Sequence, residues 1–205
     1  MSGVGPFQDN PCLRVDGLAI ARGGRVLFSG LSFAAEAGEY VEVRGANGAG
    51  KTSLIRALAG YLPPRAGTIV FERIAEPALA LHYVGHANGL KSNVSVASHA
   101  RYWSGLFGRA GDEEAALARL GLGGFGARLP RTLSQGQARR LALSRLLIAP
   151  RPIWLLDEPA AALDAQGREM LAGLIDAHRA DGGIVVAAVH EPLGPAPSLA
   201  LTVGA

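Results

Sequence analysis

The sequence predicts an α/β fold in which a parallel sheet is interrupted by a helical insertion. Short apolar runs at 39–44, 152–157 and 183–189 are typical of buried strands, and the first two are followed by helical patterns. A glycine-rich turn joins the first run to its helix. Apolar residues recur three or four positions apart over much of 93–149, which indicates helices there.

The N-terminal part, residues 13–44, is expected to form short β segments separated by glycine turns. The turns are predicted at Gly23–Gly24, Gly30 and Gly38. The last segment, EYVEVR, is apolar enough to be a buried strand. These segments would add an antiparallel β unit to the parallel sheet.

The middle of the chain first alternates and then becomes helical. A helix is expected from 51 to 59, and strands are expected at 67–71 and 80–84. The insertion at about 93–149 contains three stretches with helical spacing: VSVASHARYWSGLF, DEEAALARLG and QGQARRLALSRLLIA.

The C-terminal part returns to alternation. A strand at 152–157, a helix at 165–179 and a strand at 183–189 are followed by a short tail. No linker-like segment divides the sequence, so a single domain is expected over 1–205.

The composition excludes several classes of protein. No apolar run approaches the roughly 20 residues that a membrane-spanning helix needs, and the first residues do not form a secretory signal. Cys12 is the only cysteine, which excludes an internal disulfide. The net charge of +3 comes largely from scattered arginines, so a solvated basic surface is favoured over nucleic-acid binding. A cytoplasmic protein is expected.

The stretch GANGAGKT fits the phosphate-loop pattern G-x-x-x-x-G-K-T between a predicted strand and a predicted helix. Glycines let backbone N–H groups converge on phosphate oxygens, and the start of the helix adds a positive field. Lys51 is one of only two lysines among 20 basic residues, and its compact ammonium would lie between the β- and γ-phosphates. Thr52 would ligate Mg²⁺. The expected nucleotide-binding residues are Gly45, Ala46, Asn47, Gly48, Ala49, Gly50, Lys51, Thr52 and Ser53.

Two acids end the apolar run PIWLLDEP. The carboxyl edge of an open parallel sheet is where ligands bind, so Asp157 and Glu158 are expected beside the phosphate loop. Asp157 would hold Mg²⁺ through water, and Glu158 would orient or deprotonate the water that attacks the γ-phosphate. The alternative is that the acids simply terminate the strand.

A second small turn, LSQGQ, precedes a predicted helix. Ser134 and Gly136 offer a hydroxyl and backbone N–H groups to an anion. Ser134 could instead cap the helix, although a cap does not explain the glycine and the glutamines around it.

Together these features resemble the ABC-type ATPases, which have the P-loop NTPase fold. The phosphate loop, LSQGQ, WLLDEP, AALD at 161–164 and the histidine after IVVAAV occur in the family's order and span nearly the whole chain. The resemblance implies a head-to-tail dimer with two ATP molecules at its interface. The signature turn of one copy, with Ser134, Gly136 and Gln137, would close on ATP held by the other copy.

The resemblance also assigns roles to two other residues. Asp164 would communicate across the dimer interface, and His190 would contact the γ-phosphate and the attacking water. ATP and Mg²⁺ are the expected cofactors.

Two positions depart from the family pattern. Arg22 stands where an aromatic residue usually stacks on adenine, and a guanidinium can also stack on a ring. His86 stands where a glutamine usually touches Mg²⁺ and water and relays to the transport partner. An imidazole lacks an amide oxygen for a hard cation, so a water-mediated contact is expected there. We hypothesise that His86 senses nucleotide and couples it to the partner.

The stretches YVGHANGLK, LFSGLSF and GGIVVAAVHEPL resemble the ATP-binding subunits of the haem exporters of cytochrome c maturation. This implies an ATPase bound peripherally to the cytoplasmic face of the bacterial inner membrane by integral membrane subunits. ATP hydrolysis would drive haem export or the release of a haem-loaded chaperone. Haem ligation by this chain is not expected, because its histidines are scattered in sequence.

Other interpretations stay open. The chain could serve another small ABC exporter, or a soluble ABC protein that binds nucleic acid or ribosomes, although such proteins usually carry two cassettes. A GTPase-like module has no place for LSQGQ or His190. Tyr102, Trp103 and Phe107 could form a groove for a cytoplasmic helix of the partner, or they could only pack the helical insertion.

Overall fold

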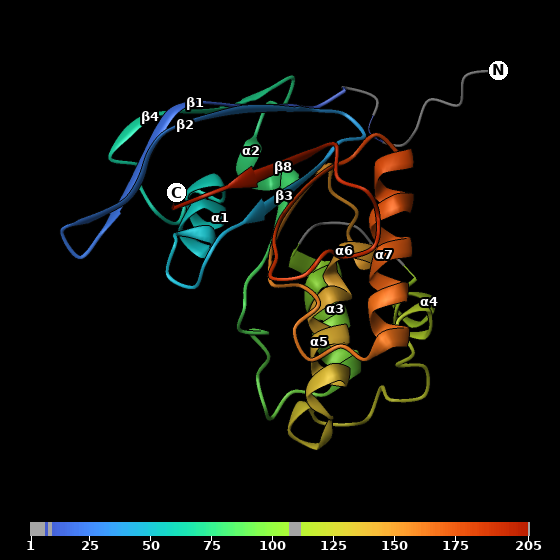
Figure 1. Cartoon of the computed structure of the whole chain (residues 1–205). Helices are drawn as coiled ribbons and strands as arrows, with labels where there is room; N and C mark the ends of the chain where they lie inside the picture. Colours follow the sequence, from blue (N-terminus) through green and yellow to red (C-terminus); the bar gives the residue numbers. More distant parts are fainter. Residues whose placement is uncertain (1–6, 8–9, 107–111, 205) are drawn as a thin grey trace.

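The computed structural model describes residues 7, 10–106 and 112–204, and it confirms the predicted α/β fold (Figure 1). A five-stranded parallel sheet has the strand order β5-β6-β7-β3-β8, and a three-stranded antiparallel sheet has the order β2-β1-β4. The antiparallel sheet and the helices α3 to α7 lie on opposite sides of the parallel sheet (Figure 1).

The strands of the parallel sheet are β5 (Leu81–Val84), β6 (Ile153–Asp157), β7 (Ile184–Ala188), β3 (Tyr40–Arg44) and β8 (Leu199–Thr202). The strands of the antiparallel sheet are β2 (Arg25–Glu36), β1 (Cys12–Arg22) and β4 (Ala66–Glu72). The helices are α1 (Lys51–Leu58), α2 (Pro77–Ala80), α3 (Val96–Leu106), α4 (Glu113–Arg119), the 3-10 turn η1 (Pro130–Thr132), α5 (Gln135–Leu143), α6 (Arg145–Ile148) and α7 (Ala165–Ala180).

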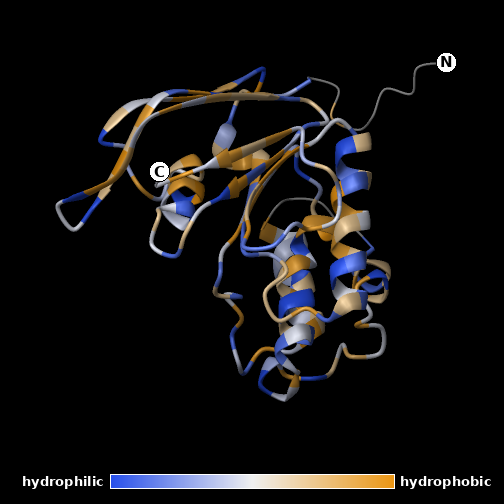
Figure 2. Ribbon diagram, viewed as in Figure 1, coloured by the Kyte–Doolittle hydropathy of each residue, from blue (hydrophilic) through white to orange (hydrophobic). Residues whose placement is uncertain are grey.

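The hydrophobic core has two layers, one on each face of the parallel sheet. Strand β6 contributes to both, because successive side chains of a strand point to opposite faces. Ile153 and Leu155 pack in the layer that includes the apolar face of α1 and the antiparallel sheet. Trp154 and Leu156 pack in the layer with α7 and the helical insertion. Burial on both faces explains why the central strands are continuous apolar runs in the sequence, seen as orange ribbon in Figure 2.

Two features predicted from the sequence are wrong, a turn and an undivided helix. Gly30 does not make a turn: it lies inside β2 with φ of 72°, beside irregular pairing with β1, so the glycine serves a bulge. The helix predicted over 135–149 is divided at Ser144 into α5 and α6. The buried Ser144 hydroxyl donates to the Leu141 carbonyl at 2.7 Å, and this local bond competes with the regular helix.

Three short elements were not predicted, and one of them is the 3-10 turn η1, which lies between two of the predicted helical stretches. Residues 77–80 form the helix α2, so β5 begins one residue later than expected. The segment described as a short tail contains β8, which pairs in parallel with β3 through Val41 and Leu199. Its four residues alternate between half-buried and exposed, a pattern too short to be distinguished from a loop.

Two buried histidines are held neutral by the fold. The Nε2 atom of His82 lies 2.6 Å from the Ala149 carbonyl, and burial lowers the pKa of His82 to about 3. The ring of His178 stacks on Trp154 with 3.8 Å between centroids, and burial lowers the pKa of His178 to about 4. An unfolded histidine has a pKa of about 6.5. Between these values the unfolded chain binds protons that the folded chain does not, so stability is lost as the pH falls.

We therefore expect the free energy of unfolding to decrease between about pH 7 and about pH 5.5, by at most about 1.4 kcal/mol per pH unit for each buried histidine. Replacing His178 with Gln removes one of these groups, so the variant should show a shallower pH dependence even if it is less stable at neutral pH. Urea unfolding at several pH values measures both slopes. Equal slopes for the parent and the variant would contradict this assignment.

Candidate functional site

The phosphate loop joins β3 to α1. Gly45, Gly48 and Gly50 all have positive φ, a conformation that side chains rarely adopt. Gly50 precedes α1 with no side-chain cap, so the first N–H groups of the helix are left for a ligand. The ammonium of Lys51 donates to the carbonyls of Gly45 and Ala46, at 2.8 and 3.2 Å. The loop is therefore folded around its own lysine.

The last residues of the described chain pack against this loop. A Cβ atom at Gly45 would lie 2.6 Å from the Val203 carbonyl oxygen, and one at Gly204 would lie 2.7 Å from the Cβ atom of Ala49. Backbone approaches this close require glycine at both positions.

A cavity of about 580 Å³ lies over the phosphate loop. Arg22 and Leu27 border it from the antiparallel sheet, which puts Arg22 where the sequence predicts a contact with the base. Glu158 and His190 border it from the carboxyl edge of the parallel sheet. The remaining lining residues are Ala46, Asn47, Gly48, Gly50, Lys51, Thr52, Ser53 and Arg56. Most of the predicted loop residues are thus brought to one cavity, while Gly45 and Ala49 shape it from behind.

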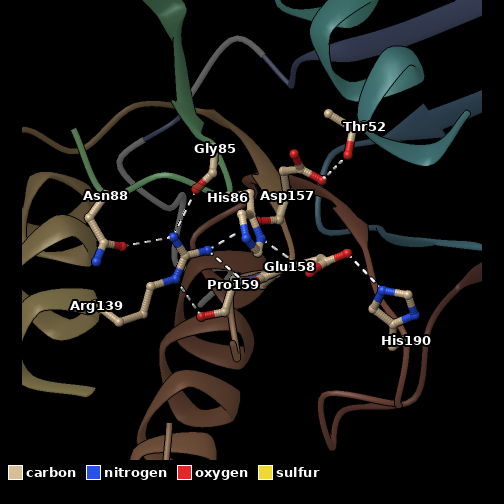
Figure 3. Close-up of polar contacts among 9 residues, drawn as sticks. All are labelled: Thr52, Gly85, His86, Asn88, Arg139, Asp157, Glu158, Pro159 and His190. Atoms are coloured by element: carbon tan, nitrogen blue, oxygen red, sulfur yellow. Dashed lines mark hydrogen bonds and ion pairs between the residues drawn. The ribbon is translucent and has the colours of Figure 1, made fainter. Parts of the chain in front are cut away.

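Asp157 and Thr52 form a pair suited to a hard cation. The hydroxyl of Thr52 donates to Oδ1 of Asp157 at 2.9 Å, as Figure 3 shows. The other carboxylate oxygen, Oδ2, is buried and has no hydrogen-bond partner. Burial raises the pKa of Asp157, and the bond from Thr52 partly offsets this. An unpaired buried carboxylate oxygen is costly, so a cation or its bound water would complete this pair, and the residues fit Mg²⁺.

Glu158 is held between two histidines. Its Oε1 lies 2.7 Å from Nε2 of His190, and its Oε2 lies 3.2 Å from Nδ1 of His86 (Figure 3). The backbone of Glu158 is left-handed, with φ of 51°, and its N–H donates to the Ala188 carbonyl. A non-glycine residue in this conformation costs about 1–3 kcal/mol and persists only where its surroundings enforce it. The strain directs the carboxylate towards the phosphate loop cavity.

His86 makes one contact that the sequence did not predict, because its imidazole reaches the carboxylate of Glu158 directly. This contact follows from geometry, since β5 pairs with β6 in parallel and the residues after these two strands meet at the same edge. The water-mediated contact of His86 with Mg²⁺ stays a prediction.

The residues of the signature turn, LSQGQ, also have structural roles within their own chain. Ser134 caps α5 by accepting from the N–H of Gln137, and the Gln137 side chain accepts from the N–H of Ser134. A Cβ atom at Gly136 would lie 2.9 Å from the Ala162 carbonyl oxygen, so a close backbone approach explains the glycine. Among the residues that border the cavity there is none from this turn. Ser134, Gly136 and Gln137 are therefore not brought to the phosphate loop of their own chain.

Asp164 lies between α7 and α5, the signature helix, which begins at the signature turn. It caps α7 by accepting from the N–H of Gly167 at 2.8 Å, and Arg140 of α5 donates to it at 2.7 Å. These bonds, the backbone bond first, hold the pKa of the Asp164 carboxyl below its ordinary value. Asp164 is exposed and ionised, and its contact across a dimer interface stays a prediction.

Arg139 was not predicted as a site residue. This side chain of α5 is almost completely buried, and it binds backbone oxygens beside both His86 and Glu158 (Figure 3). In the sequence it is one of two adjacent arginines on a helix with apolar neighbours, which usually indicates a solvated face. No local pattern distinguishes Arg139 from Arg140.

The aromatic residues of α3 divide between packing and exposure. Trp103 is half-buried, and the guanidinium of Arg145 lies 4.0 Å above its ring, so this residue packs the helical insertion. Tyr102 is 56% exposed. Phe107 lies outside the described residues.

A glycine-rich loop at the carboxyl edge of a parallel sheet, facing an acid pair, defines the class of the P-loop nucleotide hydrolases. The chain belongs to the ABC transporter family, whose model matches residues 28–161. It is an ABC-type ATP hydrolase, and its hydrolysis is coupled to transport.

Similar proteins agree with this family. The Cytochrome c biogenesis ATP-binding export protein CcmA of Rhodopseudomonas palustris strain BisB5 is 48% identical over 87% of this chain and 91% of its own. The protein of the same name from Roseobacter denitrificans is 45% identical over 93% and 89% of the two chains. An ABC transporter ATP-binding protein from Pyrococcus furiosus matches with a TM-score of 0.83 and 22% identity, over 94% of this chain and 97% of its own, which shows the shared fold.

In the described part of the chain, none of the helices combines the length and apolar character needed to cross a bilayer.

We expect changes at His86 to reduce the ATPase rate at saturating ATP by about 10-fold to 100-fold, because a misplaced Glu158 carboxylate loses its alignment with the attacking water. His86→Gln should lose less than His86→Ala, since an amide can still donate to the carboxylate. Steady-state rates with and without membrane partners measure this. If both variants match the parent in both conditions, the role given to His86 is wrong.

Proposed function

We propose that this chain is the ATP-hydrolysing subunit of an exporter complex that serves cytochrome c biogenesis, driving haem export or the release of a haem-loaded chaperone. The observation that carries the proposal is 48% identity, over 87% of the chain, to a relative named for cytochrome c biogenesis and export. The geometry of the site supports ATP hydrolysis, and the similarity to the relatives supports a role in cytochrome c biogenesis.

The residues of the cavity supply the parts of ATP hydrolysis. The phosphate loop N–H groups and Lys51 bind the phosphates, so the ammonium exchanges the carbonyls of Gly45 and Ala46 for phosphate oxygens. Glu158 accepts a proton from the water that attacks the γ-phosphorus, and His190 holds the carboxylate and reaches the γ-phosphate. Thr52 and Asp157 would hold Mg²⁺, which neutralises phosphate charge when bound.

A second copy of the chain completes the site. The cavity over the phosphate loop contains no residue of the signature turn, yet that turn presents a helix N-terminus capped by Ser134. A helix start favours anions, so the turn of one copy suits the γ-phosphate held by the other. Asp164, exposed and ionised, would lie at the same interface.

An exposed apolar surface is suited to an integral membrane partner. Tyr61 and Tyr102 are 68% and 56% exposed. Their rings contact Tyr83 and Trp103, and Arg145 reaches both of these residues, through the Tyr83 carbonyl and over the Trp103 ring. Arg145 also donates to the Asn88 carbonyl at 3.2 Å, in the loop that carries His86. A short cytoplasmic helix of the partner could dock here through apolar contacts. Peripheral attachment to the cytoplasmic face of the inner membrane would follow from this docking.

The site does not distinguish among transported molecules. An exporter of a different cargo would need the same phosphate loop, the same acid pair and the same docking surface. The ATPase subunit of another small exporter is therefore the second candidate, and it differs only in the partners.

We expect a Glu158→Gln protein to form a dimer with ATP, because binding persists while hydrolysis stops. Native mass measurement should show particles of twice the mass only when ATP is present. Adding Ser134→Asp should keep the protein monomeric: aspartate still caps α5, but its charge repels the phosphates.

The matched control is Asp112→Ser, which changes the cap of another helix of the insertion, where Asp112 accepts from the Ala115 N–H. This control should leave dimer formation intact. Single particles for Glu158→Gln with ATP, together with normal turnover of Ser134→Asp, would refute the shared site.

We expect a tagged chain to co-purify from detergent-solubilised membranes with integral membrane proteins, and cells lacking the chain to lose haem-stained c-type cytochromes. The parent gene should restore the stain, and Glu158→Gln should not, because the complex needs hydrolysis. A Tyr61→Ala, Tyr102→Ala double variant should lose the membrane proteins while its melting temperature is kept.

Val70→Ala is the control for the docking surface, since Val70 is an exposed apolar residue on the antiparallel sheet. Partners identified by mass spectrometry decide the cargo class. Normal cytochrome c staining in the deleted cells would favour the second candidate.

A further inference from the structure

Arg139 is the largest fully buried side chain of the described residues, and it is 2% exposed. Its guanidinium donates to five oxygen atoms at distances of 2.8 to 3.2 Å. The acceptors are the carbonyls of Gly85, Asp157, Glu158 and Pro159 and the side-chain oxygen of Asn88. They come from two segments far apart in the sequence, and the dashed lines in Figure 3 show the guanidinium between them.

If Arg139 only filled space in the core, burying its charge would cost free energy that an apolar residue would not. All five acceptors are neutral oxygens, so the buried cation has no carboxylate directly bonded to it. Burial lowers the pKa of Arg139, and the nearby charges of Asp157 and Glu158 partly restore it. A desolvated cation held by neutral groups is more expensive than an apolar residue of similar size. The cost indicates that the hydrogen bonds themselves are needed.

The two segments that Arg139 joins carry the two groups that meet over the phosphate loop. One segment, 85–88, contains His86, and the other, 157–159, contains Glu158. The His86 side chain is 68% exposed, so packing does not fix its position. On either side of it, Arg139 binds the Gly85 carbonyl and the Asn88 side-chain oxygen, and Arg145 binds the Asn88 carbonyl, so the segment that carries His86 is anchored at both ends.

Arg139 also belongs to the signature helix. Helix α5 begins at the Ser134 cap, about one turn before Arg139, and Gly136 lies against the Ala162 carbonyl. A displacement of the signature turn is therefore carried by a rigid helix to the segments that hold His86 and Glu158.

We propose that Arg139 is a positioning residue that links closure of the signature turn on the partner's ATP to the alignment of Glu158 and His86 in its own chain. This inference rests on the proposed function, in which each signature turn meets the nucleotide of the other copy. Arg139 itself touches neither nucleotide. It acts by holding the segments 85–88 and 157–159 in a fixed position relative to helix α5.

The test compares Arg139→Gln with Asn88→Ala in the full-length chain. Asn88→Ala removes one of the five acceptors and leaves the buried guanidinium of Arg139 in place. It therefore tests the link even if Arg139→Gln fails to fold. Arg179→Gln is the matched control, because Arg179 is a partly buried arginine that, like Arg139, donates to backbone carbonyls, those of Gly38 and Ala196. Melting temperatures report whether each variant folds.

We expect Arg139→Gln to lower kcat about 100-fold and Asn88→Ala to lower it about threefold, with KM and the ATP dissociation constant within about twofold of the parent. Combining Asn88→Ala with His86→Ala should cost no more than His86→Ala alone, because Asn88 acts through His86. Arg179→Gln should keep the parent kcat. A purely structural role would instead lower the melting temperature and the active fraction without this non-additivity.

Parent values of kcat for folded Arg139→Gln or for Asn88→Ala, or additive losses in the double variant, would overturn the inference. The failure of the proposed function looks different. In that case the parent chain itself would hydrolyse no ATP, or Glu158→Gln would stay monomeric with ATP. A parent that hydrolyses ATP and forms the dimer, with unaffected Asn88→Ala, would refute only the role of Arg139.

Discussion

Parallel pairing of β5, β6, β7 and β3 is the constraint on which the site depends. Parallel strands bring their carboxyl ends to one edge, so the segments that follow four different strands meet there. The phosphate loop follows β3, His86 follows β5, the acid pair ends β6, and His190 follows β7. Residues separated by more than a hundred positions are thereby brought within hydrogen-bonding distance, as the Thr52–Asp157 bond shows.

Groups with an unfavourable energy are also concentrated at this carboxyl edge of the parallel sheet. Asp157 has an unpaired buried oxygen, Glu158 adopts a strained backbone conformation, and Arg139 is buried among neutral oxygens. Each feature costs stability, and the apolar layers on both faces of the sheet offset that cost. Features of this kind are expected at functional sites, where they are kept for function at a cost in stability.

The sequence predicts the parts of the site whose chemistry is local. The phosphate loop is recognisable because glycine spacing, a lysine and a following helix are adjacent in the chain, and the acid pair is recognisable at the end of an apolar run. The Glu158–His86 contact could not be predicted, since it depends on the register of β5 against β6. Arg139 was missed because only the tertiary structure distinguishes it from Arg140. Strand β8 was missed because its pairing with β3, and not its four residues, makes it a strand.

The residues that follow β8 contact the phosphate loop, so the size of the side chain at one of the two positions, 49 and 204, limits the size at the other. A Cβ atom at Gly204 would lie 2.7 Å from that of Ala49, so a side chain at position 204 would require glycine at position 49 or a shifted backbone, and a residue larger than Ala49 would require a shifted backbone. The shape of the nucleotide cradle is thus set in part by residues that never touch the nucleotide and that lie at the other end of the described chain.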